Sequence, residues 1–406
     1  MNGSKYCAMR SFSCLRNSLT KIFVATVLGG IGCLVTSLST ASPSSFQANP
    51  DAGAGDVIVH GKFGGLIFGF EIDSTNSDGL LSEAVLNSDG TVSARVETFS
   101  QSTGRILKVL AGSESQDDFV TWGIAQSIGL VGKEHVRSPF HVERVFRTIN
   151  PLSGNQINGA WTPPIDRKHV INQVKPSPDG SSNVAVYAVS VSSDASPILF
   201  TSDLATNTFG SVIDVTHPDF ITEAPPVIAF DVARNQVILG HDKPSGFIEP
   251  PVLGFVDLAT GAFVERTGRG LGVINGIAVD SEDGILCTDT SFDSGAQFFN
   301  LDDFTGINVL LPGANPQNST ASGADIEFDP INKLFLIAQP FSDGMLDNGS
   351  SIQVYDVSGN LVESVNGLNF QGGDNVFPIH IALNPSRRIG FVNGPDLTTA
   401  IQSFNY

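Results

Sequence analysis

Four polar residues in the second half of the chain carry side chains that could do metal-assisted chemistry. They are Glu223, Asn275, Asp325 and His380. Carboxylate and amide oxygens are ligands that a hard cation such as Ca²⁺ prefers, and Ca²⁺ accepts about six to eight of them. An imidazole can transfer protons near neutral pH. In this hypothesis the first three residues hold Ca²⁺ or another divalent cation, and His380 is the catalytic acid and base.

The same residues also allow a purely structural interpretation. Asn275 could cap a turn, Asp325 could solvate a loop, and His380 could form hydrogen bonds within the core. A corresponding polar position earlier in the chain is either Asn172 or Gln173. The choice between the two interpretations depends on where the surrounding elements place the side chains.

A repeated block positions three of the four residues. Each copy is a short apolar strand that ends in Asp or Asn, and the copies are 228–231, 277–280, 326–329 and 381–384. Each copy is followed within a few residues by a second β-rich run. The block acids Asp231, Asp280 and Asp329 recur at one place in the repeat, so we expect them to accept hydrogen bonds from turn amides rather than to act in catalysis.

A second marker is a short polar turn between two β-rich runs. Its seven copies end at Gly104, Gly154, Asn207, Gly261, Gly306, Gly359 and Thr399. Gly and Asn tolerate positive φ best, which is what such a turn requires. Thr399 departs from the pattern. No segment after residue 41 shows a sustained helical period.

Units of about 40–55 residues with four short strands each are typical of β-propeller blades. The predicted blades are 66–112, 118–160, 165–216, 225–268, 274–312, 323–367 and 376–406. The last unit shows only three strands, and 56–60 is a spare strand that could complete it. We therefore predict an all-β, seven-bladed β-propeller over residues 56–406, closed by an N-terminal strand in the last blade.

The stretch 275–284, Asn-Gly-Ile-Ala-Val-Asp-Ser-Glu-Asp-Gly, resembles repeats of the NHL, YVTN and gluconolactonase-type β-propeller superfamily. The resemblance covers mainly residues 220–395 and implies a propeller. In gluconolactonase-type enzymes a Glu before a Pro, an Asn before a Gly and an Asp before a Gly hold a cation. Glu223, Asn275 and Asp325 are similar, although Ala224 follows Glu223 and Ile326 follows Asp325. Those enzymes also have six blades, whereas seven are predicted here.

The first 41 residues have the order of a secretory signal. Four basic residues with no acid precede an apolar run at 22–38, and small residues end the segment at Ala41. We predict a signal peptide at 1–41, a flexible linker at 42–55, and a secreted or periplasmic protein with no stable membrane insertion after cleavage. An uncleaved anchor is the alternative. Acylation at Cys33 is disfavoured, because Gly30 stands where a lipobox prefers Leu.

The net charge and the cysteine content limit which partners and which disulfides can be expected. Removing residues 1–41 changes the net charge from −19 to −23. Nucleic acid is excluded as an expected partner, since phosphate binding needs clustered Lys and Arg. Cys287 is the one cysteine after residue 41, so no intramolecular disulfide is expected.

Two functions remain open. The first is a monomeric, exported propeller that binds a small molecule or a protein, or acts as a scaffold. The alternative is a metal-dependent, lactonase-like hydrolase with its site at the central channel.

Overall fold

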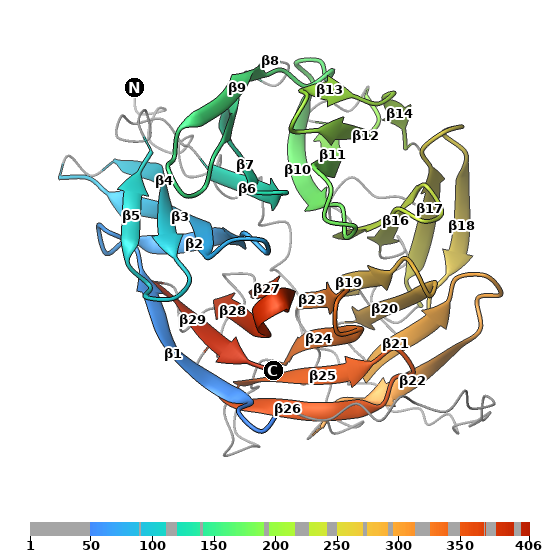
Figure 1. Ribbon diagram of the computed structural model, residues 1–406. Helices are drawn as coiled ribbons and strands as arrows, with labels where there is room; N and C mark the ends of the chain where they lie inside the picture. Colours follow the sequence, from blue (N-terminus) through green and yellow to red (C-terminus); the bar gives the residue numbers. More distant parts are fainter. Residues whose placement is uncertain are drawn as a thin grey trace, which may run out of the picture.

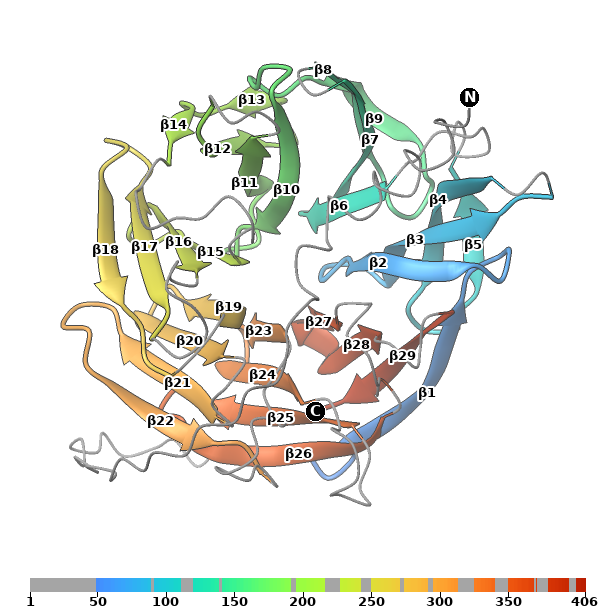
Figure 2. The ribbon, with the colours of Figure 1, turned by 180° about the vertical axis from the view of Figure 1, so that it is seen from behind.

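The computed structural model describes residues 49–88, 91–110, 120–138, 141–190, 195–215, 227–241, 250–270, 274–290, 295–312, 325–339, 350–368, 370, 379–393 and 399–406. In these residues the chain forms seven antiparallel sheets, arranged as blades around one axis (Figures 1 and 2). The predicted seven-bladed β-propeller is therefore confirmed. No helix among these residues is long and apolar enough to cross a bilayer.

The first strand of each blade lies nearest the axis (Figure 1). Blade 1 contains β2 (Leu66–Ile72), β3 (Asp78–Leu86), β4 (Val92–Ser100) and β5 (Ile106–Val109). Blade 2 contains β6 (Val120–Ala125), β7 (Ile128–Ser138), β8 (His141–Ile149) and β9 (Gln156–Trp161). Blade 3 contains β10 (His169–Pro176), β11 (Asn183–Ser190) and β12 (Ile198–Asp203), and both β13 (Thr208–Phe209) and β14 (Ile213–Asp214) pair with β12.

The other four blades follow in chain order. Blade 4 contains β15 (Val227–Asp231), β16 (Gln236–His241), β17 (Val252–Asp257) and β18 (Phe263–Thr267). Blade 5 contains β19 (Ile274–Asp280), β20 (Ile285–Thr290), β21 (Gly295–Asn300) and β22 (Gly306–Leu310). Blade 6 contains β23 (Asp325–Asp329), β24 (Leu334–Gln339), β25 (Ser350–Asp356) and β26 (Leu361–Leu368). Blade 7 contains β27 (His380–Asn384), β28 (Ile389–Asn393), β29 (Ala400–Asn405) and β1 (Gly53–His60), with a 3-10 helix, η1 (Pro385–Arg387), between β27 and β28.

Closure of the ring depends on the first strand of the chain. β1 pairs with β29, with Val59 opposite Ile401, and becomes the outer strand of blade 7. The closing strand was predicted at 56–60, and in the structure it begins earlier, at Gly53. Pairing of the first and last strands covers a sheet edge that would otherwise be exposed.

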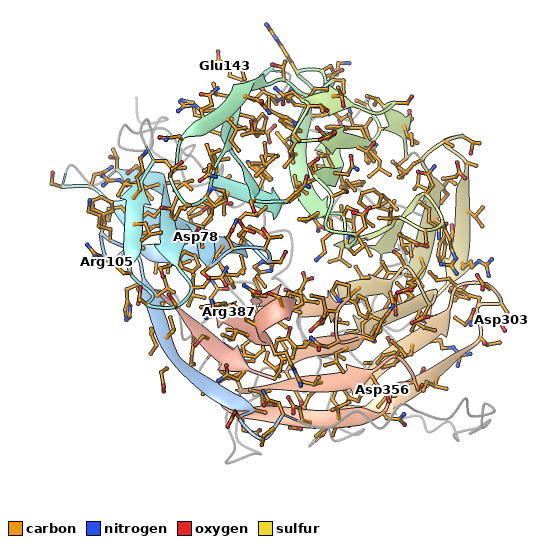
Figure 3. All side chains as sticks on the ribbon, in the orientation of Figure 1. Asp78, Arg105, Glu143, Asp303, Asp356 and Arg387 are labelled. Carbon is orange, nitrogen blue, oxygen red and sulfur yellow. The ribbon has the colours of Figure 1, made fainter. Side chains whose placement is uncertain are left out.

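The hydrophobic core is divided into seven clusters, one between each pair of neighbouring blades. Alternation along each strand produces this arrangement, because successive side chains point to opposite faces of a blade. In the repeated block, for example, Ile277 packs toward blade 4 and Ala278 packs toward blade 6. Side chains fill the space between blades around the whole ring (Figure 3).

The two faces of the ring differ in their connections. On the bottom face the first strand of each blade ends, and short turns join first to second and third to fourth strands. The carboxylate of Asp280 accepts the N–H groups of Glu282 and Asp283, and that of Asp329 accepts those of Ile331 and Asn332. The predicted turn role of these two acids is therefore confirmed. The first strand of each blade begins on the opposite face, which we call the top face.

Six of the seven predicted polar turns join the third and fourth strands of a blade. Positive φ occurs at the expected third residue in five of them, Gly104, Gly154, Asn207, Gly261 and Gly359. In the fifth copy it occurs at Phe304 instead, two residues before Gly306, which begins β22. The seventh copy, 397–399, lies between two strands as predicted, but residues 397 and 398 are outside the described residues. Thr399 belongs to the connection from β28 to β29, most of which lies outside the described residues, and the fourth strand of blade 7 comes from the start of the chain.

Candidate functional site

The innermost strands of the seven blades can be aligned with one another by the blade interface into which each residue packs. In each strand one apolar residue packs toward the preceding blade, and the next residue occupies what we call the ring position. The ring positions are Glu71, Ala125, Lys175, Ala229, Ala278, Glu327 and Ala382. Four are alanine, so the three charged side chains have few large neighbours at this level.

Lys175 and Glu327 form an ion pair between blade 3 and blade 6. At least two blades separate these strands in either direction around the ring, so the pair crosses the centre. The side chains are 28% and 21% exposed, respectively. Burial lowers the pKa of Lys175, but the carboxylates of Glu327, Asp325 and Glu71 outweigh it and raise that pKa. Lys175 therefore stays protonated among three carboxylates.

Asp325 joins blade 6 to blade 7. Its Oδ1 accepts the N–H of Ile326 at 3.0 Å, and its Oδ2 accepts the N–H of Ile381 at 2.8 Å. The same Oδ2 lies 3.0 Å from Nδ1 of His380. Burial tends to raise the pKa of Asp325, but the hydrogen bond and charge of His380, with the charge of Lys175, lower it. Asp325 is thus an ionised residue that also stabilises the blade interface.

His380 lies between two carboxylates. Its Nδ1 contacts Asp325, and its Nε2 lies 3.9 Å from Oε1 of Glu71 in blade 1. Phe70 meets the imidazole edge-on, with ring centroids 5.0 Å apart. Burial lowers the pKa of His380, but Asp325, Glu71 and Glu327 raise it above its ordinary value. The pair with Asp325 holds the ring in one orientation, with Nε2 toward Glu71.

These five residues form the central cluster, which comprises Glu71, Lys175, Asp325, Glu327 and His380. It draws on blades 1, 3, 6 and 7. Each side chain is between 19% and 29% exposed, so the charged groups are only partly buried. The cluster offers three carboxylates, an ammonium and an imidazole, and can therefore bind polar groups and transfer protons.

Several inner strands contain an extra residue at the same place. The pairing with the second strand skips one residue at Phe68, Trp122, Asn172 and Asn275. Such β-bulges redirect side chains and are common beside functional sites. Asn172 and Asn275 thus occupy equivalent positions near the top face, one residue before Gln173 and Gly276.

The structure brings together part of the site predicted from the sequence. Asp325 and His380 are in contact, and Gly276, next to Asn275, packs against the backbone of Asp325. Glu223 lies outside the described residues. Among the residues that the structure describes, no group of three or more His, Cys, Asp and Glu is arranged to hold a metal ion. The positive charge near these carboxylates comes from Lys175 and from the protonated form of His380.

Sequence reasoning missed Glu71, Lys175 and Glu327. The signal that could have found them is the ring position itself, where charged residues replace the alanine of the other blades. In blade 3 the block is Val174-Lys175-Pro176-Ser177, and its proline made the strand hard to see.

Comparison with known proteins supports the fold. No protein-family model matches this chain. No curated protein matches it. A chain of a solved structure described as "Crystal Structure of Mitotic Checkpoint Complex" is similar over 93% of this chain and 99% of its own length, with a TM-score of 0.56 and 12% sequence identity. At this identity the likeness concerns the fold alone. The chain is a seven-bladed β-propeller, and that architecture is what it shares with the solved structure.

Proposed function

We propose that this chain is an exported β-propeller that binds a small molecule or a protein through its top face and central cluster. The observation that carries the proposal is the set of partly buried charged groups at the centre of the ring, Glu71, Lys175, Asp325, Glu327 and His380. Four of the seven ring positions are alanine, so a small apolar side chain is enough for packing at this place in a blade. Charged residues in the other three are costly to bury and need a further reason.

The bottom face is used for holding blades together. Ser281 Oγ accepts the N–H of Val232 across blades 4 and 5, and Lys333 Nζ lies 3.0 Å from Asp280 across blades 5 and 6. The Tyr406 hydroxyl donates to Asp329 across blades 6 and 7. The top face, where the inner strands and their bulges begin, is the surface that we propose for a partner.

The seven-bladed fold that this chain shares with the solved structure supports a binding or scaffold role in general. The cluster contains both signs of charge, so a suitable partner presents a basic and an acidic group close together. Such a group can compete for Lys175 and for the three carboxylates at once. The N-terminal signal-like segment supports export, where the strongly acidic surface would also aid solubility.

The test uses the purified chain as an immobilised bait in the fluid into which it is exported. The variant Lys175→Met with Glu327→Gln removes the central ion pair without changing the net charge. The matched control is Arg234→Met with Asp302→Asn, which removes a bottom-face ion pair of 2.7 Å. The central variant is expected to reduce capture about tenfold or more, equivalent to about 1.4 kcal/mol, while the control retains it.

Equal capture of the partner by the unaltered protein, the central variant and the control would show that the central cluster does not take part in binding. Loss of capture by the control variant alone would indicate that the partner binds the bottom face. Cross-linking of the captured partner to Lys62, near the start of β2, rather than to Lys333 of the bottom turns would support the proposed face.

A metal-dependent, lactonase-like hydrolase is the second candidate, and one observation favours it. His380 is held by Asp325 on one side and faces Glu71 at 3.9 Å on the other. This gap is too long for a direct hydrogen bond, but one water oxygen can bridge it. The arrangement resembles a general base that is oriented by a carboxylate.

In that reaction Nε2 of His380 would accept a proton from the bridging water as the water oxygen attacks a lactone carbonyl carbon. The imidazolium would then return the proton to the ring oxygen as the carbon–oxygen bond of the lactone breaks, leaving a hydroxy acid. Asp325 would stabilise the imidazolium. Asn275 and Asp325, with Glu223, are the proposed ligands of a divalent cation that would polarise the carbonyl.

The hydrolase is tested by metal content of the purified protein and by thermal melts with EDTA and with added Ca²⁺. A bound ion in stoichiometric amount, with a melting shift that Asp325→Ala abolishes, would support the metal site and justify a lactone screen. His380→Gln should then abolish turnover. Absence of both the ion and the shift would rule out the metal-dependent reaction and leave the binding function.

A further inference from the structure

Two fully buried carboxyl groups lie side by side in blade 1. They belong to Glu83 on β3 and Glu97 on β4, and both residues have no exposed surface. Both lie on the side of the blade that packs against blade 7, together with Leu81 and Phe99. Oε1 of Glu97 has no hydrogen-bond partner among the described residues. None of the functions considered above uses these two residues.

Both carboxyl groups bind the connection from β1 to β2, residues 61–65. The N–H of Lys62 donates to Oε2 of Glu97 at 2.9 Å. The N–H of Phe63 donates to both oxygens of Glu83 at 3.2 Å, and the N–H of Gly65 donates to Oε1 of Glu83. Three backbone donors of one five-residue segment therefore depend on two acids.

The segment is shaped for this contact. A Cβ on Gly61 would lie 2.5 Å from Cδ of Glu83, and a Cβ on Gly65 would lie 2.2 Å from the carbonyl oxygen of Ala84. Only glycine permits such a close approach of the backbone. The guanidinium of Arg95 lies 4.0 Å from the centre of the Phe63 ring and stacks on this residue of the segment.

The location of the segment gives the contact a structural consequence. It follows β1, the strand that closes the ring in blade 7, and leads into the innermost strand of blade 1 at the top face. The segment is thus the covalent link across the junction where the ring closes. Any change in its attachment alters the end of the closing strand and the adjoining top face.

We propose that Glu83 and Glu97 form a pH-sensitive latch that fastens the 61–65 segment while Glu97 carries a proton and loosens it when Glu97 ionises. With one proton bound, Oε1 of Glu97 can donate to Glu83, and all three backbone donors keep an acceptor. With both groups ionised, two negative charges adjoin each other away from water, which favours separation of the strands and segment.

Burial and the charged groups around Glu83 and Glu97 determine the direction in which the pKa of Glu97 shifts. The pKa of Glu97 is raised to about 7, because burial, the largest cause, and the adjacent Glu83 together outweigh the backbone N–H and the charge of Lys62, which lower it. Arg95 lies two residues along β4 and stacks on Phe63. The folded protein therefore binds more protons than the unfolded chain between pH 4.5, the ordinary pKa, and about pH 7. The stabilisation falls as pH rises through this window.

Backbone amide exchange tests the latch on the folded protein. Exchange at Lys62, Phe63 and Gly65 is compared at about pH 6 and about pH 8, on either side of the Glu97 pKa, after correction for the intrinsic rates. We expect protection of these three amides to fall about tenfold at the higher pH. Amides of the central strand β16 serve as the internal reference and should keep their protection.

Glu97→Gln is the decisive variant, because the amide keeps an acceptor for Lys62 and a donor for Glu83 but cannot ionise. It should retain protection at both pH values. Glu134→Gln is the matched control, since Glu134 is a buried carboxyl group of blade 2 whose pKa burial also raises to about 7. This control should preserve the pH dependence at 61–65.

Equal corrected rates at the two pH values in the unaltered protein would overturn the latch, even if a variant failed to fold. Persistence of the pH dependence in Glu97→Gln would also overturn it. Neither result bears on ligand binding at the central cluster, which is measured separately.

Discussion

Lys175 of blade 3 reaches across the ring to Glu327 of blade 6, and the two residues are 152 positions apart in the chain. This pair connects strands that share no sheet and no blade interface. It also holds an ammonium among carboxylates that would otherwise repel one another. The central cluster is therefore both a candidate binding site and a contributor to ring stability.

A double-mutant cycle measures the central pair. Lys175→Met is expected to reduce the free energy of unfolding by about 2 kcal/mol at neutral pH, because it leaves Glu71, Asp325 and Glu327 with only His380 as a cationic neighbour. Glu327→Gln should reduce the free energy of unfolding by about 1 kcal/mol, since Asp325 and Glu71 still face Lys175. The double variant should lose about 1 kcal/mol less than the sum of the two, as measured by denaturant unfolding. Strict additivity would contradict a direct interaction.

His380 should titrate above the ordinary histidine pKa of 6.5, because Asp325 and Glu71 stabilise the imidazolium more than burial opposes it. The stability from this pair is complete below pH 6.5 and is lost as pH rises through the raised pKa. Nuclear magnetic resonance of the imidazole C–H protons measures the shift directly. Asp325→Asn should lower the pKa of His380, and an unchanged titration would show that Asp325 does not set it.

Lys333 should stabilise the junction of blades 5 and 6. Its Nζ lies 3.0 Å from Asp280, which is almost fully buried, and 2.7 Å from the exposed Glu282. Lys333→Met should reduce the free energy of unfolding by about 2 kcal/mol, because Asp280 loses its cation and keeps only turn amides. Glu282→Gln is the matched control and should change stability by less than about 0.5 kcal/mol. Equal effects of the two substitutions would contradict the role of the buried acid.

Export should remove the first 41 residues. A basic segment followed by the apolar run 22–38 and small residues predicts cleavage near Ala41. Intact mass of the protein recovered outside the cytoplasm should match a chain that begins close to residue 42. A mass that includes residues 1–41, with the protein in the membrane fraction, would instead indicate an uncleaved anchor.

Most of the strands, the number of blades and the means of closure could be predicted from the amino-acid sequence alone. These features are local or repetitive, since strands alternate with a period of two and most pair with their neighbours in the chain. The blocks that end at Asp280 and Asp329 each predicted an inner strand and its turn. Gly104 and Gly359 likewise predicted tight turns that require positive φ. The spare strand 56–60 predicted closure because the last unit lacked a fourth strand.

Which side chains meet at the centre and at the closing junction depends on the packing of the blades in three dimensions. Asp325 and His380 were recognised as candidates, yet their contact arises because blades 6 and 7 are neighbours. Glu71 faces His380 only because the ring closes between blade 7 and blade 1. Lys175 and Glu327 meet only because seven blades enclose a narrow centre. Such contacts join residues far apart in the sequence, and no local period or turn residue encodes them.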